Sequence, residues 1–170
     1  MLHSVRTLDW GGAEPYRTIA DDAVPPACAV GRFHDLWQSL RPDDGVPSRR
    51  DFAPSDVPQL APWLMILDLL PDCGYRYRLC GTGCASLFGI DYTGMLLGDR
   101  LPPDAAEIRR REFERVLHEC QPLLSQTRVP LPGREFIAIF RGVFPFARHP
   151  EGVPDQVVVA VSPAEQELPA

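Results

Sequence analysis

The chain has 170 residues, of which 45% are hydrophobic and 24% charged, and its formal net charge is −6 at pH 7. This length suffices for one domain with a sizeable core, and the negative charge argues against a surface that binds nucleic-acid phosphates. The longest apolar run, residues 61–70, is too short to cross a bilayer, and the N-terminus lacks the pattern of a signal peptide. We therefore expect a cytoplasmic protein without membrane insertion.

Residues 1–29 have the composition of a partly ordered N-terminal arm. Pairs of Gly, Asp and Pro recur in it with little periodicity. Its large apolar residues Trp10, Tyr16 and Ile19 favour docking on the domain or on a partner subunit as strongly as simple disorder. We expect one domain over residues 30–162, followed by a polar tail over residues 163–170.

An amphipathic helix is predicted over residues 32–40. Its apolar residues recur at the i, i+3, i+4, i+7 spacing of one helix face: Phe33, Leu36, Trp37 and Leu40. This stripe either packs on the core or forms a dimer interface, and Phe33 and Trp37 are the candidate interface residues.

Two arginines stand out in the segment that follows, PSRRDFAPSDVP (residues 47–58). Arg49 and Arg50 either pair with neighbouring acids at the surface or act as ligands for a phosphate-bearing molecule. Surface pairing is the simpler interpretation.

A hairpin is predicted next. Residues 63–70 are apolar on both faces of a strand, and the turn at 71–74 joins them to a strand in which Tyr75, Tyr77 and Leu79 share one face. A short helix then begins at Thr82 and ends at Gly89, where a left-handed conformation is favourable.

The longest predicted helix covers residues 105–120, with Phe113 in its inner stripe. The run Arg109–Arg111 is expected to lie on a solvated face with Glu107, the less favoured alternative being a patch for an anionic partner. Three strands follow, at 123–129, 135–146 and 155–162.

The segment LFGIDYTGMLLGDRL, residues 87–101, resembles the signature of PAS sensory domains. Together with Trp37 and Arg41, PSRRDFAPSDVP and RLCGT, it makes the chain similar to a bacterial family of stand-alone PAS-like proteins of unknown function. The resemblance covers roughly residues 30–162. It implies an α+β fold, a five-stranded antiparallel sheet with helices on one face and an N-terminal flanking helix.

The resemblance also implies a pocket between sheet and helices, which in PAS domains holds haem, flavin, a small metabolite or nothing. The candidate lining residues, each otherwise an ordinary core residue, are Tyr77, Phe88, Met95, Leu96, Phe113 and Phe140. No cofactor is indicated by motif. His118 is a weak haem-ligand candidate, because haem PAS domains use a His from their long helix, and it is more simply a charge at a helix end.

The sequence carries no catalytic or metal-binding pattern. The five cysteines include no C-x-x-C, and the histidines show no metal-ligand spacing. We therefore expect no enzyme, but a sensory or regulatory domain that binds a small molecule or a protein partner and signals by protein association, including homodimerisation. The alternatives are a ligand-free protein–protein interaction module and a small α+β enzyme that uses the same cavity.

Overall fold

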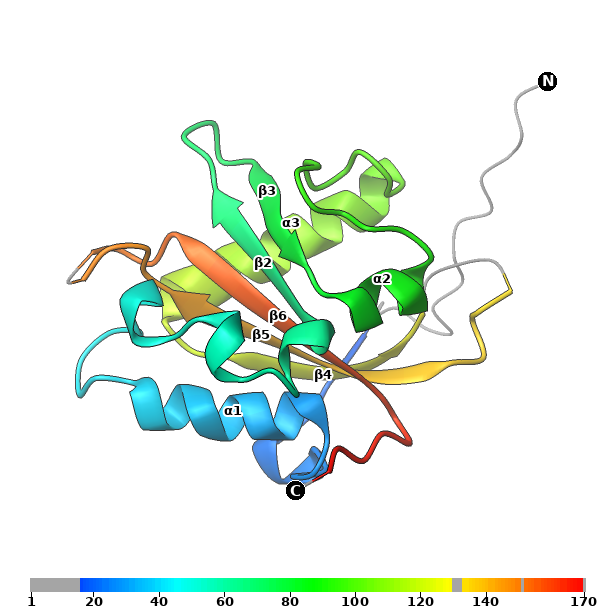
Figure 1. Cartoon of the computed structure of the whole chain (residues 1–170). Coiled ribbons are helices and arrows are strands. Elements are labelled where there is room, and N and C mark those ends of the chain that lie inside the picture. Colours follow the sequence, from blue (N-terminus) through cyan, green and yellow to red (C-terminus); the bar gives the residue numbers. More distant parts are fainter. Residues whose placement is uncertain (1–15, 130–132, 151, 170) are drawn as a thin grey trace.

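The computed structural model describes residues 16–129, 133–150 and 152–169. In this part of the chain, six strands form one antiparallel sheet in the order β1-β4-β5-β6-β2-β3 (Figure 1). The strands are β1 Arg17–Thr18, β2 Leu64–Leu69, β3 Tyr75–Cys80, β4 Leu123–Arg128, β5 Ala138–Phe146 and β6 Gln156–Pro163. The same residues include the helices α1 Ala29–Leu40, α2 Thr82–Phe88 and α3 Pro103–Glu119, with single helical turns at 21–23, 49–51, 54–56 and 61–63. The expected α+β class is confirmed.

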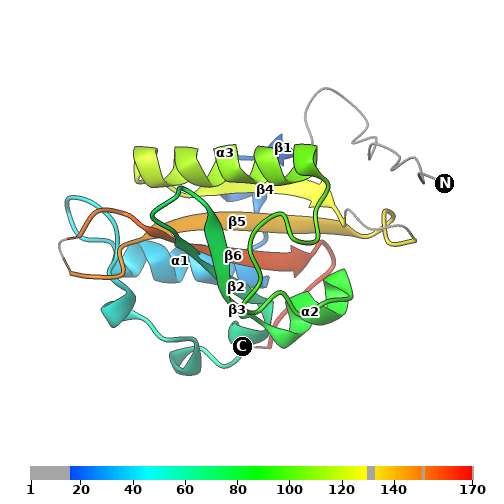
Figure 2. The same cartoon turned by 90° about the horizontal axis from the view of Figure 1, so that it is seen from above.

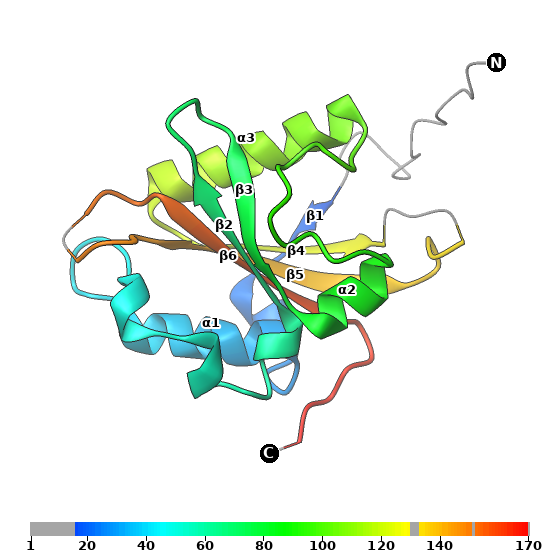
Figure 3. The same cartoon turned by 45° about the horizontal axis from the view of Figure 1, so that its top comes forward.

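The strand beyond the five predicted ones comes from the N-terminal arm. Arg17 of β1 pairs with Gln126 of β4, and the N–H of Ile19 donates to the carbonyl oxygen of Leu124 at 3.0 Å. Figure 3 shows β1 beside β4, near α3. The arm is therefore docked on the sheet edge from residue 16 onward, while Trp10 lies outside the described residues.

β2 and β3 form the predicted hairpin, with one irregularity. The register shifts between Ile66, which faces Leu79, and Leu67, which faces Tyr77, so Arg78 is an extra residue in β3. The prediction that Leu79 shares a face with Tyr77 is wrong, because this bulge turns Leu79 to the opposite side of the sheet. An alternation pattern does not show an inserted residue.

Helices cover both faces of the sheet (Figure 2). On one face, α1 packs against Ile66, Phe144 and Val158. On the other face, α2 and α3 pack against a second cluster that includes Leu67 and Val159. The helix layer expected on one face therefore consists of α2 and α3, and the flanking helix α1 covers the opposite face.

The C-terminal residues of the chain contact the N-terminal end of α1. The helix begins three residues before the predicted start, after Cys28. The N–H of Ala29 donates to the side-chain oxygen of Gln166 at 3.1 Å, and the Arg32 guanidinium donates to the carbonyl oxygen of Leu168 at 2.8 Å. The predicted polar tail is thus in contact with α1.

The outer face of α3 carries a series of ion pairs. Arg110 and Arg111 both bind Glu107, at 2.7 Å and 2.8 Å, and Arg115 binds Glu119 at 3.0 Å. The surface prediction for Arg110 and Arg111 is confirmed. It is wrong for Arg109, because this residue lies on a different side of the helix from Arg110 and Arg111 and its side chain is largely buried.

The residues after α2 cover the outer edge of β3. Gly89 ends α2 with a left-handed backbone, φ 75°, as predicted. The N–H of Gly94 donates to the carbonyl oxygen of Tyr77 at 2.7 Å, and the N–H of Tyr77 donates to the carbonyl oxygen of Met95 at 2.9 Å. Residues 89–101 connect α2 to α3 along the edge of β3, and we call this segment the lid.

Gly81 joins β3 to α2 where two backbone segments meet. A Cβ atom there would lie 2.4 Å from the carbonyl oxygens of Ala61 and Pro62, which are main-chain atoms and cannot rotate away. We expect Gly81→Ala to lower the free energy of unfolding by about 1–3 kcal/mol, measured by urea denaturation. Ser86→Ala, at an exposed position of α2, is the control and should change it by less than about 0.5 kcal/mol. Equal effects of the two substitutions would show that the close approach is absent.

A charged cavity under the lid as the candidate functional site

A cavity lies between the lid and the face of the sheet that α3 covers. Its volume is about 60 Å³, counted as the space open to the centre of a water molecule, which is room for roughly four to six waters. Met65, Leu67, Ile139 and Val159 line it from the strands. These four residues form the apolar part of the floor, to which β4 and β5 also contribute Thr127 and Arg141.

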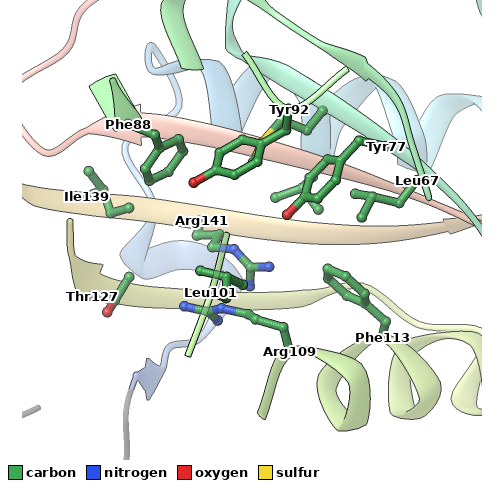
Figure 4. Close-up of a pocket in the computed structure, with 12 residues that line it drawn as sticks. Leu67, Tyr77, Phe88, Tyr92, Leu101, Arg109, Phe113, Thr127, Ile139 and Arg141 are labelled. Atoms are coloured by element: carbon green, nitrogen blue, oxygen red, sulfur yellow. The ribbon is translucent and has the colours of Figure 1, made fainter. Parts of the chain in front are cut away.

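Two stacked tyrosines line the cavity on the lid side. The rings of Tyr77 and Tyr92 lie 5.0 Å apart at an interplanar angle of 23°, and Phe88 stands edge-on to Tyr92 at 6.4 Å. Figure 4 shows the hydroxyl of Tyr77 directed toward Arg141. Neither tyrosine hydroxyl forms a hydrogen bond with any residue that the structure describes. Both are therefore available to a molecule in the cavity.

A buried cluster of three charges forms the opposite side. Glu112 of α3 accepts hydrogen bonds from Arg141 of β5 and, at 3.1 Å, from Arg109 of α3. The Glu112 side chain is 0% exposed, and those of Arg141 and Arg109 are 6% and 13% exposed. The Arg141 guanidinium also lies 5.7 Å from the centre of the Phe113 ring. Both arginines line the cavity, and the glutamate lies behind them.

The charges of the arginines keep Glu112 ionised. Burial by itself raises the pKa of this carboxyl, but the positive charges of Arg141 and Arg109 and the hydrogen bonds they donate outweigh burial, so its pKa lies below the ordinary value. Burial and the repulsion from Arg141 lower the pKa of Arg109, while Glu112 opposes this effect. At neutral pH the cluster contains two positive charges and one negative charge.

The guanidinium groups retain unused donors. The hydrogen bonds to Glu112 involve Nη1 of Arg109 and Nη1 of Arg141. A guanidinium has five N–H donors, and Nε and Nη2 of both arginines have no acceptor among the described residues. The cavity therefore offers several N–H donors next to an uncompensated positive charge.

The tyrosine hydroxyls also act as donors. Burial, followed by the effect of Tyr92, raises the pKa of Tyr77, and burial raises the pKa of Tyr92. Both phenols stay protonated at neutral pH, so each can donate a hydrogen bond to an anionic oxygen.

Arg109 connects the cavity to the N-terminal segment. Its guanidinium carbon lies 5.5 Å from the centre of the Tyr16 ring, a cation–π contact. Tyr16 directly precedes β1. A molecule that moves Arg109 therefore also changes a contact of the segment that enters the sheet edge.

Three of the six predicted lining residues do line this cavity: Tyr77, Phe88 and Phe113. Phe140 does not, because it lies on the α1 face of the sheet, one position from the lining residues of β5. Met95 and Leu96 are in the lid but do not line the cavity, and Leu96 is 40% exposed. The prediction is wrong for these three residues.

The predicted interface residues lie in the interior. Phe33 and Trp37 are both 0% exposed, packed between α1 and the sheet, and Phe33 meets Phe144 edge-on at 4.9 Å. The Nε1–H of Trp37 donates to the carbonyl oxygen of Pro145 at 3.0 Å. Their prediction as interface residues is wrong, because the apolar stripe of α1 is consumed by the core of its own chain.

Two further candidates lie away from the cavity. His118 is exposed in the last turn of α3 and is not among the residues that line the cavity, so its prediction as a haem ligand is wrong. Arg49 donates to the carbonyl oxygen of Phe52 and lies over the ring of that residue at 5.1 Å. The described residues contain no group of three His, Cys, Asp or Glu side chains placed to hold a metal ion.

Sequence reasoning missed the charged half of the site. Arg141 was the available signal, since it is the single charged residue of the strand AIFRGVFPF. Glu112 gave a weaker signal, because it directly precedes Phe113 of the inner helix stripe. A charged residue in an otherwise apolar strand needs a buried partner, but the sequence does not say which residue supplies it.

The comparisons with known proteins agree with the fold. A family model described as a PAS domain matches residues 27–149, well over half of the chain. The match includes the lid, α3 and the first four strands that follow the arm, together with Arg109, Glu112 and Arg141. A search of the curated proteins finds no match. Among the described residues, no helix has both the length and the apolar character that a membrane span requires.

Proposed function

Since the chain belongs to the PAS domain family, we propose that it is a sensory or regulatory module that binds a small molecule in the cavity under the lid. The observation that carries this proposal is the cavity itself, which holds the unused donors of two buried arginines and two tyrosines. A packed core without a ligand role leaves few voids larger than a water molecule and few polar groups without a partner.

The lid is the element through which occupancy is transmitted in this proposal. Tyr92 and Leu101 of the lid line the cavity from one side, while Ile139 and Arg141 line it from the sheet. A ligand that contacts both sides favours one arrangement of lid and sheet over another in proportion to its difference in affinity for the two. The contact between Arg109 and Tyr16 extends this effect to the N-terminal segment.

The read-out that we propose is protein association, with either a partner protein or a second copy of the chain. The interface does not use Phe33 or Trp37, because both are buried. The N-terminal segment next to β1 and the lid are the parts whose arrangement depends on the ligand, so partner binding should depend on them.

Blocking the cavity tests the proposal. Leu101 is a half-buried lid residue that lines the cavity, and Leu101→Trp adds a ring at that place. Wild-type protein should show NMR shift changes at cavity residues with at least one small probe from a panel of neutral, anionic and cationic compounds of up to about eight heavy atoms. Leu101→Trp should remove these changes while leaving the far-UV circular dichroism unchanged.

The matched control substitutes another residue of the lid. Leu96→Trp changes a lid side chain that does not line the cavity, so it should leave probe binding as in wild type. If no probe of any charge reaches the wild-type cavity, the chain is instead a ligand-free interaction module. Binding that survives Leu101→Trp would place the probe elsewhere and would likewise contradict the proposal.

A further inference from the structure

The charge of the cavity indicates what kind of molecule it takes. Two guanidinium groups face one carboxylate, and among the described residues that line the cavity no acidic side chain is present. One positive charge is therefore left without a partner, on guanidinium side chains that are only 6% and 13% exposed. Burying a charge is costly unless it is paired, so a ligand with a single negative charge is favoured over a neutral or dianionic one.

The geometry of the donors selects the anionic group. Arg141 and Arg109 bind the same carboxylate with one nitrogen each, which leaves Nε and Nη2 of both in a planar fork. Such forks match the two oxygens of a carboxylate. Figure 4 shows the hydroxyl of Tyr77 directed toward the same place. The phenol adds a neutral donor without adding charge.

The apolar residues that line the cavity indicate the chemistry of the rest of the ligand. Phe88, Tyr92 and Ile139 extend the cavity to one side of the arginines as an aromatic and aliphatic surface (Figure 4). Apolar surface of this kind is favourable only for a hydrocarbon group. The volume of about 60 Å³ limits the ligand to a few heavy atoms.

We infer that the cavity binds a small organic monocarboxylate, with its carboxylate between Arg109 and Arg141 and its hydrocarbon part against Phe88 and Ile139. This inference rests on the proposed function, since it names the ligand class of the same cavity. Glu112 has a positioning role, because it holds both guanidinium groups and does not line the cavity.

Paired probes of similar size test the inference. Butyrate, its neutral counterpart butyramide and the cation butylammonium are titrated into the wild-type protein, with binding followed by NMR shift changes of cavity residues. Butyrate should bind at least about tenfold more tightly than butyramide, because a hydrogen bond to a charged group is worth more than a neutral one. Butylammonium should not bind.

Arginine variants on one helix provide the structural control. Arg109→Met should weaken butyrate binding by at least about tenfold and butyramide binding by a smaller factor, because butyramide loses only a neutral acceptor's hydrogen bond. Arg111→Met removes a guanidinium two residues away, whose side chain is 74% exposed and pairs with Glu107, and should change butyrate binding less than twofold. If Arg109→Met does not fold, the comparison of butyrate with butyramide on the wild-type protein decides the question.

The outcomes separate this inference from the proposed function. Butyramide binding in the cavity as tightly as butyrate, or butyrate binding that Arg109→Met leaves intact, overturns the carboxylate assignment and leaves small-molecule binding in place. The same holds for butyrate binding that persists in Leu101→Trp while a neutral probe is lost. Failure of every probe to reach the cavity overturns both.

Discussion

Replacing Glu112 by glutamine is expected to lower the free energy of unfolding by about 3–5 kcal/mol. The substitution preserves the size of the side chain but removes the negative charge that both Arg109 and Arg141 contact. Two guanidinium groups then remain buried next to each other without a counter-charge, and neither can move to water without disturbing α3 or β5. Urea denaturation followed by circular dichroism measures the loss.

The exposed side of α3 offers a matched control. Glu114 also binds an arginine, Arg110, but its side chain is 45% exposed. Glu114→Gln should therefore change the free energy of unfolding by no more than about 0.5 kcal/mol. Equal losses for Glu112→Gln and Glu114→Gln would show that the buried cluster does not carry the expected energy.

Acid should reduce the difference in the free energy of unfolding between the wild-type protein and Glu112→Gln. The pKa of Glu112 in the folded protein lies below its ordinary value of 4.5, so the folded state binds this proton less readily than the unfolded state. The stabilisation is therefore complete above pH 4.5 and is lost as the pH falls through the folded pKa. Arg109 and Arg141 are the charged groups that contact the carboxyl. A difference that stays constant between about pH 7 and pH 3 would contradict this assignment.

Replacing all three charged residues of the cluster should lower the free energy of unfolding less than replacing Glu112 alone. The combination Arg109→Met, Glu112→Leu and Arg141→Met replaces three buried charges by apolar side chains, and such replacements are often neutral or stabilising. We expect this variant to unfold at higher urea concentration than Glu112→Gln and to lose butyrate binding. That result would show that the arginines serve ligand binding at the expense of stability.

Trp37→Ala is the second substitution with a large expected effect. The side chain is 0% exposed, and its Nε1–H donates to the carbonyl oxygen of Pro145 at 3.0 Å. Truncation leaves a cavity between α1 and β5 and an unpaired carbonyl group, so we expect a loss of about 3–5 kcal/mol in the free energy of unfolding. Trp37→Phe, which keeps most of the ring volume, should lose less.

The oligomeric state distinguishes a core residue from an interface residue. Gln38→Ala, at the exposed neighbouring position, is the control and should leave stability unchanged within about 0.5 kcal/mol. Light scattering should give the same mass for Gln38→Ala, Trp37→Phe and wild type. A Trp37 variant whose free energy of unfolding is unchanged but whose oligomer has a different mass would identify Trp37 as an interface residue.

The order of the elements could be predicted from local patterns. The hairpin from β2 to β3, the end of α2 at Gly89 and the long α3 each have a signal in a few adjacent residues, namely a period of two, a glycine that adopts a left-handed backbone, or an apolar stripe. These signals depend on short-range sterics and hydrogen bonding. The resemblance that rests on the lid agrees with the family match.

The tertiary structure decides which face of the sheet each side chain of β5 lies on. β5 is buried along almost its whole length on both sides, so its sequence has no polar side that indicates which face meets α3. The sequence pattern predicts Phe140 in the pocket, whereas in the structure Ile139 and Arg141, one residue to each side, line it. In the same way, the apolar stripe of α1 could pack on the core or on a partner protein. Only the position of α1 over β5 and β6 shows that it packs on the core.

The sequence alone therefore determined the fold class, the order of helices and strands from α1 onward and the solvated position of Arg110 and Arg111. The tertiary structure decided which helix faces inward, how β3 changes register and which arginine is buried. The charged cluster illustrates the reason: Glu112 and Arg141 are 29 residues apart, and they meet only because β5 lies beneath α3. Contacts across such separations depend on how layers pack, which no local periodicity contains.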